Sequence, residues 1–179
     1  KNKKQVKPEK PLNSYPSVTV QLPVYNEKYV VARLIEAVCQ LDYPKEQLEI
    51  QVLDDSNDET TGIIDHEIAS WKESGVNIHR IARPKRKGFK AGALQYGLEQ
   101  AKGEFIAIFD ADFLPTPDFL KKTLSQFDQE IGMVQTRWGH INEDYSLLTR
   151  MQAFGLNAHF SVEQSGRNIS GKFMNFNGT

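Results

Sequence analysis

Phe105-Ile106-Ala107-Ile108-Phe109-Asp110-Ala111-Asp112 is the stretch of sequence that decides the fold. It is an uncharged apolar run that leads into two carboxylates one residue apart, and two prolines, Pro115 and Pro117, follow it. A short run of this kind predicts a strand buried on both faces, as in a parallel sheet flanked by helices. In such sheets ligands bind beyond the carboxyl ends of the strands, which is where Asp110 and Asp112 stand.

The two carboxylates have two interpretations. Residues i and i+2 that leave an extended segment point the same way, so Asp110 and Asp112 can reach one divalent cation. The alternative is a solvated Asp-x-Asp in a turn, because Asp is common in turns. The triplet by itself leaves both interpretations open.

Strand and helix patterns alternate along the rest of the chain. Strands are predicted at 17–22, 48–53, 77–82, 105–109 and 133–136. Helices are predicted at 26–41, 59–74, 88–103, 117–127 and 146–163, with Asn26 as a cap of the first and Gly75 ending the second. This order predicts an α/β fold with a mainly parallel, right-handed sheet and helices on both faces.

The composition narrows the possible functions. The chain has 179 residues, which suits one domain or slightly more, and its 25% charged and 39% hydrophobic residues are typical of a soluble globular protein. A net charge of −1 provides no overall field for nucleic acid, so no nucleic-acid partner is expected. The single cysteine excludes an intrachain disulfide and a cysteine-based zinc site. The sequence has neither a G-x-G-x-x-G nor a P-loop motif.

The two ends of the chain differ from its middle. Residues 1–16 are rich in lysine and proline, and we interpret them as a basic arm or linker. This arm is either a solvated segment or a juxtamembrane cytoplasmic one. Residues 174–179 are apolar and turn-like, so we expect the chain to stop inside a domain.

Three polar loops follow predicted strands and are expected to meet at one edge of the sheet, namely 23–27, 54–56 and 110–112. Asp55 can accept hydrogen bonds from a base or a ribose, and Lys90 can place a positive charge near phosphates. The 110–112 loop suits a hard cation on a diphosphate, because Mg²⁺ and Mn²⁺ favour oxygen ligands.

Simpler interpretations exist for several residues near these loops. Asp54 and Asp58 can serve as turn or cap residues only. Gly88 and Gly92 either let backbone N–H groups approach an anion or allow close packing of the loop and helix.

Taken together, these residues resemble the family 2 glycosyltransferases of the GT-A (Rossmann-like) fold, and within them the cellulose-synthase-like enzymes, notably β-mannan and β-glucan synthases. The motifs that carry the resemblance are Leu22-Pro23-Val24-Tyr25-Asn26-Glu27, Gln51-Val52-Leu53-Asp54-Asp55-Ser56, Lys90-Ala91-Gly92-Ala93-Leu94, Phe109-Asp110-Ala111-Asp112-Phe113, Val134-Gln135-Thr136-Arg137-Trp138, Thr149-Arg150-Met151-Gln152 and Phe176-Asn177-Gly178-Thr179. They follow the family order over residues 17–179.

The resemblance implies a nucleotide-sugar donor, UDP- or GDP-linked, a glycan acceptor and Mg²⁺ or Mn²⁺ as cofactor. The donor-binding residues that it implies are Pro23, Tyr25, Glu27, Asp55, Lys90 and Asp110. Asp55 would bind the base and Lys90 the uridine or diphosphate side of the donor. Asp112, together with Asp110, would hold the metal.

The resemblance also implies an inverting transfer of a hexose, from UDP-glucose or GDP-mannose, to a growing β-glycan. The general-base Asp of the family is expected beyond Thr179, so residues 17–179 are interpreted as the N-terminal, nucleotide-sugar-binding part of a GT-A domain. No catalytic residue is expected within the chain, which is expected to be inactive alone. The parent enzyme is expected to be embedded in a membrane, with this domain on the cytoplasmic face.

Two alternatives of other classes stay open. A nucleotidyltransferase shares a parallel sheet, metal-binding Asp residues and a Lys, but it normally has a Gly-rich first loop, which residues 23–27 do not supply. The other alternative is a non-catalytic nucleotide-binding module. The carboxylates Asp55, Asp110 and Asp112 argue against it.

Overall fold

A computed structural model describes residues 12, 14–136 and 145–151 of the chain. The chain divides into two compact units, one comprising residues 11–125 and the other residues 1–10 and 126–179. The larger unit contains every residue that the sequence predicts for the donor and metal sites. The boundary predicted between residues 16 and 17 remains a prediction.

The larger unit contains a sheet of four parallel strands in the order β3-β2-β1-β4. The strands are β1 (Val18–Val24), β2 (Leu48–Asp54), β3 (Ile78–Ile81) and β4 (Phe105–Ile108). The chain runs from the centre of the sheet outward to β3 and then returns to the other side of β1. The strand order therefore reverses between β1 and β4, and a sheet of this kind binds its ligands at such a point.

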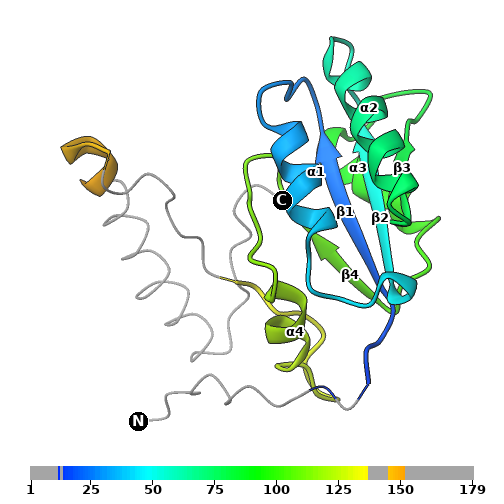
Figure 1. Ribbon diagram of the computed structural model, residues 1–179, viewed down its shortest axis with the longest axis vertical. Coiled ribbons are helices and arrows are strands. Elements are labelled where there is room, and N and C mark those ends of the chain that lie inside the picture. Colours follow the sequence, from blue (N-terminus) through cyan, green and yellow to red (C-terminus); the bar gives the residue numbers. More distant parts are fainter. Residues whose placement is uncertain (1–11, 13, 137–144, 152–179) are drawn as a thin grey trace. The chain divides into compact units, whose positions relative to one another are not determined.

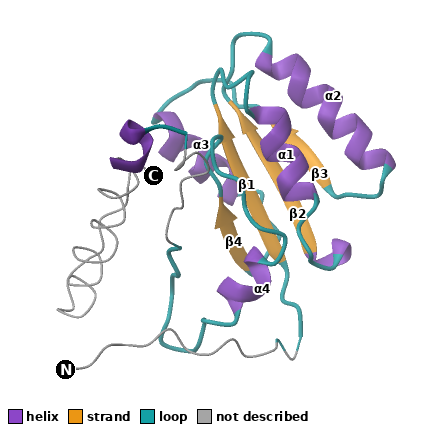
Figure 2. Ribbon diagram, turned by 60° about the vertical axis from the view of Figure 1, so that its left-hand side comes forward, coloured by secondary structure: helices purple, strands orange, loops and turns teal. Residues whose placement is uncertain are grey.

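Helices cover both faces of this sheet, as predicted (Figures 1 and 2). The helices of the larger unit are α1 (Val31–Cys39), α2 (Thr60–Glu73), α3 (Phe89–Leu98) and α4 (Phe119–Leu124), with a short 3-10 helix, η1 (Lys45–Gln47), before β2. Figure 2 shows α1 and α2 on one face of the sheet and α3 on the opposite face. The predicted α/β class with a mainly parallel sheet is confirmed.

Part of the hydrophobic core lies on the face of α1 and α2. Alternate residues of β1 point to this face, and Val20 and Leu22 are fully buried. Helix α1 places Leu34, Ile35 and Val38 on one side at helical spacing, and all three are fully buried. Packing of this apolar stripe on the sheet therefore positions α1.

The opposite face carries a polar layer beneath α3. Thr19 donates a hydrogen bond to Glu49 (2.6 Å), and Gln21 donates one to Gln51 (3.0 Å). All four side chains are buried, so each pair supplies partners that water cannot. Gly97 of α3 lies directly over the two glutamines, which sets how closely the helix approaches the sheet.

Two predictions about strands are wrong. None of the four residues of β4 is fully buried, and Ile108 is 43% exposed, so the strand is not buried on both faces. An apolar run does not report whether another layer packs on each of its faces. Residues 133–136 form no strand.

The sequence predicts that these helices exist more accurately than it predicts where they begin and end. Asn26 does not cap α1: the residue that precedes the helix is Val30, and no side chain caps it. Gly75 ends α2 in the left-handed conformation (φ 77°), as predicted. Helix α3 ends at Leu98, not near residue 103, and α4 is shorter than 117–127.

The described residues of the smaller unit are 126–136 and 145–151. A helical turn at 147–151 begins the predicted segment 146–163, whose remainder lies outside the described residues. Ser146 precedes this turn, and its side chain accepts a hydrogen bond from the Thr149 N–H (3.2 Å), as an N-cap residue does. No helix within the described ranges is long and apolar enough to cross a bilayer.

We predict that Gly97→Ala destabilises the fold by about 1–3 kcal/mol, the usual cost of overpacking. The added Cβ would lie 2.6 Å from Leu53 Cδ2 and 2.8 Å from Gln21 Nε2, so α3 must move off the sheet. The measurement is the free energy of unfolding by urea titration. Gly62→Ala in α2 is the matched control: nothing lies within 4 Å of its Cβ position, and stability should rise by about 0.5–1 kcal/mol. Equal effects of the two substitutions would contradict this account of α3 packing.

Candidate donor and metal site

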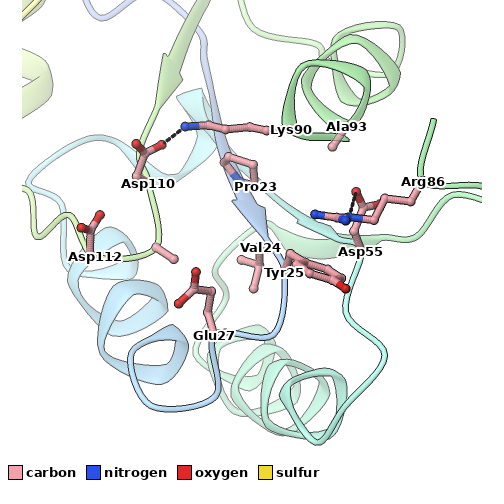
Figure 3. Close-up of a pocket in the computed structure, with 11 residues that line it drawn as sticks. Pro23, Val24, Tyr25, Glu27, Asp55, Arg86, Lys90, Ala93, Asp110 and Asp112 are labelled. Carbon is pink, nitrogen blue, oxygen red and sulfur yellow. Dashed lines mark hydrogen bonds and ion pairs between the residues drawn. The ribbon is translucent and has the colours of Figure 1, made fainter. Parts of the chain in front are cut away.

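The loops that follow β1, β2 and β4 converge on one pocket of about 430 Å³ (Figure 3). It lies beyond the carboxyl ends of the strands, at the point where the strand order reverses. All seven predicted site residues line it: Pro23, Tyr25, Glu27, Asp55, Lys90, Asp110 and Asp112. Four further lining residues were not predicted: Val24, Arg86, Ala93 and Ala111. The sequence therefore identified the place and most of its charged groups.

Hydrogen bonds between the first two loops hold Tyr25 and Glu27 at the pocket. The Asp55 N–H donates to the Val24 carbonyl (3.0 Å), which continues the pairing of β1 with β2 past the strand ends. Asn26 adopts a left-handed backbone (φ 56°), which Asn tolerates better than most residues. Its side chain exchanges two hydrogen bonds with Asn57, at 2.9 and 3.0 Å. This pairing, made across the loops, is what Asn26 does in place of capping α1.

Asp54 and Asp58 serve as turn residues, as the simpler interpretation proposed. Asp54 accepts hydrogen bonds from the Ser56 N–H (2.9 Å) and the Thr61 hydroxyl (2.8 Å). Asp58 accepts one from the Thr60 N–H (3.0 Å), and its hydrogen bonds with Thr60 lower the pKa of its carboxyl. Of Asp54, Asp55 and Asp58, only Asp55 lines the pocket.

Asp55 is held by Arg83, a residue whose role the sequence did not predict. The Arg83 guanidinium donates to both carboxylate oxygens of Asp55, from Nε (2.7 Å) and from Nη2 (2.5 Å). Both side chains are only 7% exposed, and the hydrogen bonds to Asp55 raise the pKa of Arg83. The one signal in the sequence was an arginine placed directly after the third strand.

Arg83 also fixes the start of α3. Its Nη1 donates to the Lys87 carbonyl (2.6 Å) and its Nη2 to the Phe89 carbonyl (2.7 Å). These carbonyls flank Gly88, whose φ of 74° is one that L side chains rarely adopt. A Cβ at Gly92 would lie 2.0 Å from the Lys87 carbonyl oxygen and 2.5 Å from Arg83. Packing therefore explains both glycines, without an anion at the backbone.

Arg86 lies at the same end of the pocket, over an aromatic ring. Its guanidinium carbon is 3.4 Å from the centroid of the Tyr25 ring and 5.0 Å from that of Phe89. Its Nε is 3.6 Å from an oxygen of Asp55. Figure 3 shows the side chain crossing the pocket toward Asp55 and Tyr25.

The other end of the pocket is acidic. Lys90 forms an ion pair with Asp110, and Figure 3 shows Asp112 beyond it on the same loop. Within the described residues, the side chains of Asp112 and Glu27 make no hydrogen bond or ion pair. Both residues are exposed, so their carboxylates are available to a ligand.

This donor set fits a hard cation only when a ligand completes it. No group of three or more His, Cys, Asp or Glu in the described part of the chain could hold a metal alone. Mg²⁺ is usually bound by one or two carboxylates together with phosphates, and Mn²⁺ accepts the same oxygen ligands. Asp110 and Asp112 provide that number of carboxylates. A metal at this place would therefore bind together with a phosphate-bearing ligand.

We predict that Arg83→Met destabilises the protein by about 1–3 kcal/mol, because the buried Asp55 carboxylate loses its paired donor. Thermal or urea unfolding measures the change. Lys121→Met removes an exposed ion pair with Asp42, whose side chain is 65% exposed, and should cost less than about 1 kcal/mol. If both substitutions have the same small effect, Arg83 does not organise the pocket.

The fold and the pocket define a class of protein: a parallel α/β domain with a charged ligand pocket where the strand order reverses. Residues 19–178 match the family described as Glycosyl transferase family 2. The chain belongs to this family.

Similar proteins agree with this assignment. The chain is 45% identical over 177 residues to probable glucomannan 4-beta-mannosyltransferase 7 of Oryza sativa subsp. japonica, covering 96% of this chain and 30% of the relative. It is 44% identical over 172 residues to the probable glucomannan 4-beta-mannosyltransferase 3 of the same organism, covering 93% of this chain and 31% of the relative. The chain thus spans less than a third of the length of these relatives. The resemblance to cellulose-synthase-like β-mannan synthases is confirmed.

Solved structures support the fold. The mannosyltransferase PcManGT from Pyrobaculum calidifontis, in complex with GDP-Man and Mn²⁺, matches with a TM-score of 0.59 and 31% identity, over 64% of this chain and 33% of that one. S. aureus TarS 1-349 in complex with UDP-GlcNAc matches with a TM-score of 0.53 and 25% identity, over 61% of this chain and 30% of that one. The predicted fold, that of the GT-A glycosyltransferases, is confirmed.

Proposed function

We propose that this chain is the donor-binding part of a metal-dependent, inverting glycosyltransferase that transfers mannose from GDP-mannose to a growing β-glycan. The observation that carries the proposal is that aromatic, basic and acidic residues from separate parts of the chain line one pocket. They are Tyr25, then Arg86 and Lys90, and then Glu27, Asp55, Asp110 and Asp112. The names of the two rice relatives and the ligands of PcManGT favour mannose and GDP over glucose and UDP.

The nucleoside would bind at the Tyr25 end of the pocket. Tyr25 offers an aromatic face, and Asp55 offers carboxylate oxygens that each retain one lone pair beside the bond to Arg83. A guanine edge carries two neighbouring N–H donors, and a uracil edge carries one. A carboxylate accepts two parallel donors well, which supports guanine.

The diphosphate would lie between the two ends, within reach of Lys90. The Lys90 ammonium, now paired with Asp110, can share its charge with a phosphate oxygen. Asp112 and Asp110 would hold Mg²⁺ or Mn²⁺ against the same phosphates. Such a metal supplies positive charge that stabilises the departing diphosphate.

The reaction joins the acceptor to the anomeric carbon of mannose. The acceptor hydroxyl oxygen forms a bond to that carbon from the side opposite the diphosphate, which inverts the configuration. The bond to the diphosphate oxygen breaks, and the diphosphate leaves with the electron pair. A general base takes the hydroxyl proton; the resemblance assigns this role to an Asp beyond Thr179. The residues described here bind and orient the donor.

We also propose where the parent enzyme acts. A membrane-embedded synthase would present this domain on the cytoplasmic face, where nucleotide sugars are available as donors. The lysine-rich first residues and the family resemblance support that location.

We predict that GDP-mannose binds the chain, that Mn²⁺ strengthens the binding, and that Asp112→Ala removes only the metal-dependent part. The loss in the presence of Mn²⁺ should be roughly ten- to a hundredfold, since a charged contact is removed. Calorimetric titration with GDP-mannose, UDP-glucose, GDP and UDP, with and without Mn²⁺, measures both effects. Glu73→Ala in α2, an exposed acidic residue outside the pocket, is the control for net charge.

Each outcome of that titration has a meaning. Preference for UDP and UDP-glucose would keep the glycosyltransferase and replace the donor. Binding and turnover of a nucleoside triphosphate would favour the nucleotidyltransferase alternative. Metal-independent binding that Asp112→Ala leaves unchanged would contradict the metal site and favour a non-catalytic nucleotide-binding module.

A further inference from the structure

Arg86 is placed where the proposed nucleobase needs to lie. Its guanidinium carbon is 3.4 Å from the centroid of the Tyr25 ring, which is a stacking distance for two planar groups. Its Nε is 3.6 Å from Asp55 Oδ2, the oxygen that also accepts a hydrogen bond from Arg83 Nη2 (2.5 Å). A base that stacks on Tyr25 and donates to Asp55 would use the same ring and the same oxygen.

The guanidinium also resembles a base chemically. It is planar, it carries N–H donors along its edge, and it stacks on aromatic faces. Arg86 therefore lies over Tyr25 and within 3.6 Å of Asp55, the two groups that a guanine would contact. Figure 3 shows it beside Tyr25 and Asp55 among the residues that line the pocket.

We propose that Arg86 competes with the nucleobase for Tyr25 and Asp55, and so sets how tightly the donor binds. This inference rests on the proposed function, because it assumes a nucleotide in this pocket. A base enters only when the guanidinium leaves, so the apparent dissociation constant equals the intrinsic one divided by the fraction of molecules in which Arg86 is unstacked. Arg86 is thus a residue that lowers donor affinity, although it is a cation in a pocket for an anionic ligand.

The surrounding contacts make this exchange possible. Arg86 is 36% exposed on its side chain and pairs with Asp55 at a distance longer than a hydrogen bond, so its hold is weak. Arg83 keeps Asp55 in place through two hydrogen bonds, whether or not Arg86 is stacked. Arg83 also holds the loop that carries Arg86, through the carbonyls of Lys87 and Phe89. The loop can therefore stay while one side chain turns out.

The sign of the effect of Arg86→Ala on affinity tests the proposal. We expect it to tighten the binding of GDP in the presence of Mn²⁺ by about three- to tenfold, because the cation–π contacts of Arg86 and its loose ion pair with Asp55 no longer compete with the base. Removal of a cation that contacts the ligand would weaken binding instead. Lys85→Ala, which removes a charge of the same sign from the same loop, shows the long-range electrostatic effect alone. Calorimetric titration of the whole chain and of both variants gives the comparison.

A second measurement follows the guanidinium directly. The side-chain N–H signal of Arg86 in a nitrogen–proton correlation spectrum should be shifted upfield by the Tyr25 ring in the free protein. It should return toward its ordinary position as GDP and Mn²⁺ saturate the site. Tyr25→Leu should remove the upfield shift without any nucleotide. A signal that stays shifted in the saturated protein would show that the base does not displace Arg86.

The outcomes separate this inference from the proposed function. Tighter binding by Arg86→Ala than by Lys85→Ala supports the competition, and so does binding that appears only in Arg86→Ala. Equal or weaker binding by Arg86→Ala overturns the competition and leaves the nucleotide site intact. If neither the wild-type chain nor Arg86→Ala binds GDP or UDP, the proposed function fails and the inference fails with it.

Discussion

The central position of β1 is the constraint on which the rest of the structure depends. β1 is hydrogen-bonded to β2 on one side and to β4 on the other, in parallel on both. Parallel strands end at the same edge of a sheet, so the loops after all three strands must open there. Charged residues that are up to 85 positions apart, such as Glu27 and Asp112, thereby line one pocket without any direct contact between them. The strand topology therefore determines where the pocket lies, and the loops supply the side chains that line it.

Two of the four carboxylates in the pocket are each paired with a basic side chain, and the pairing explains their placement. Asp55 is neutralised by Arg83, and Asp110 by Lys90. The two carboxylates that remain without a partner in the described part of the chain, Asp112 and Glu27, are both exposed to solvent, where a charge costs little. Their repulsion of a diphosphate is the physical reason why a divalent cation has to accompany such a ligand.

The sequence predicted the features that depend on the spacing of apolar residues and on the order of the strands. The alternation in β1 and the stripe of α1 predicted the two sides of the core, and the strand ends predicted which carboxylates share an edge. It failed where a contact is made between segments far apart in the chain. Asn26 has the residue type of an N-cap, but its partner is Asn57, and no local pattern contains that residue. The predicted burial of β4 failed for a related reason, since an apolar run carries no information about what packs on its two faces.

Arg83 and Arg86 show most clearly that a sequence pattern does not reveal contacts between distant segments. Their burial and hydrogen bonds in the fold do reveal their roles. In the sequence they are two of the charges in one basic loop, three residues apart, and that loop would ordinarily be interpreted as a solvated surface. In the fold, one guanidinium is 7% exposed and binds four acceptors on two residues of the loop and on Asp55. The other is stacked on Tyr25 and five times as exposed. Burial with four hydrogen bonds makes Arg83 part of the scaffold, whereas partial exposure with imperfect contacts makes Arg86 replaceable. Both residues carry the same charge. What separates a residue that builds a site from one that competes for it is how completely its N–H donors are hydrogen-bonded.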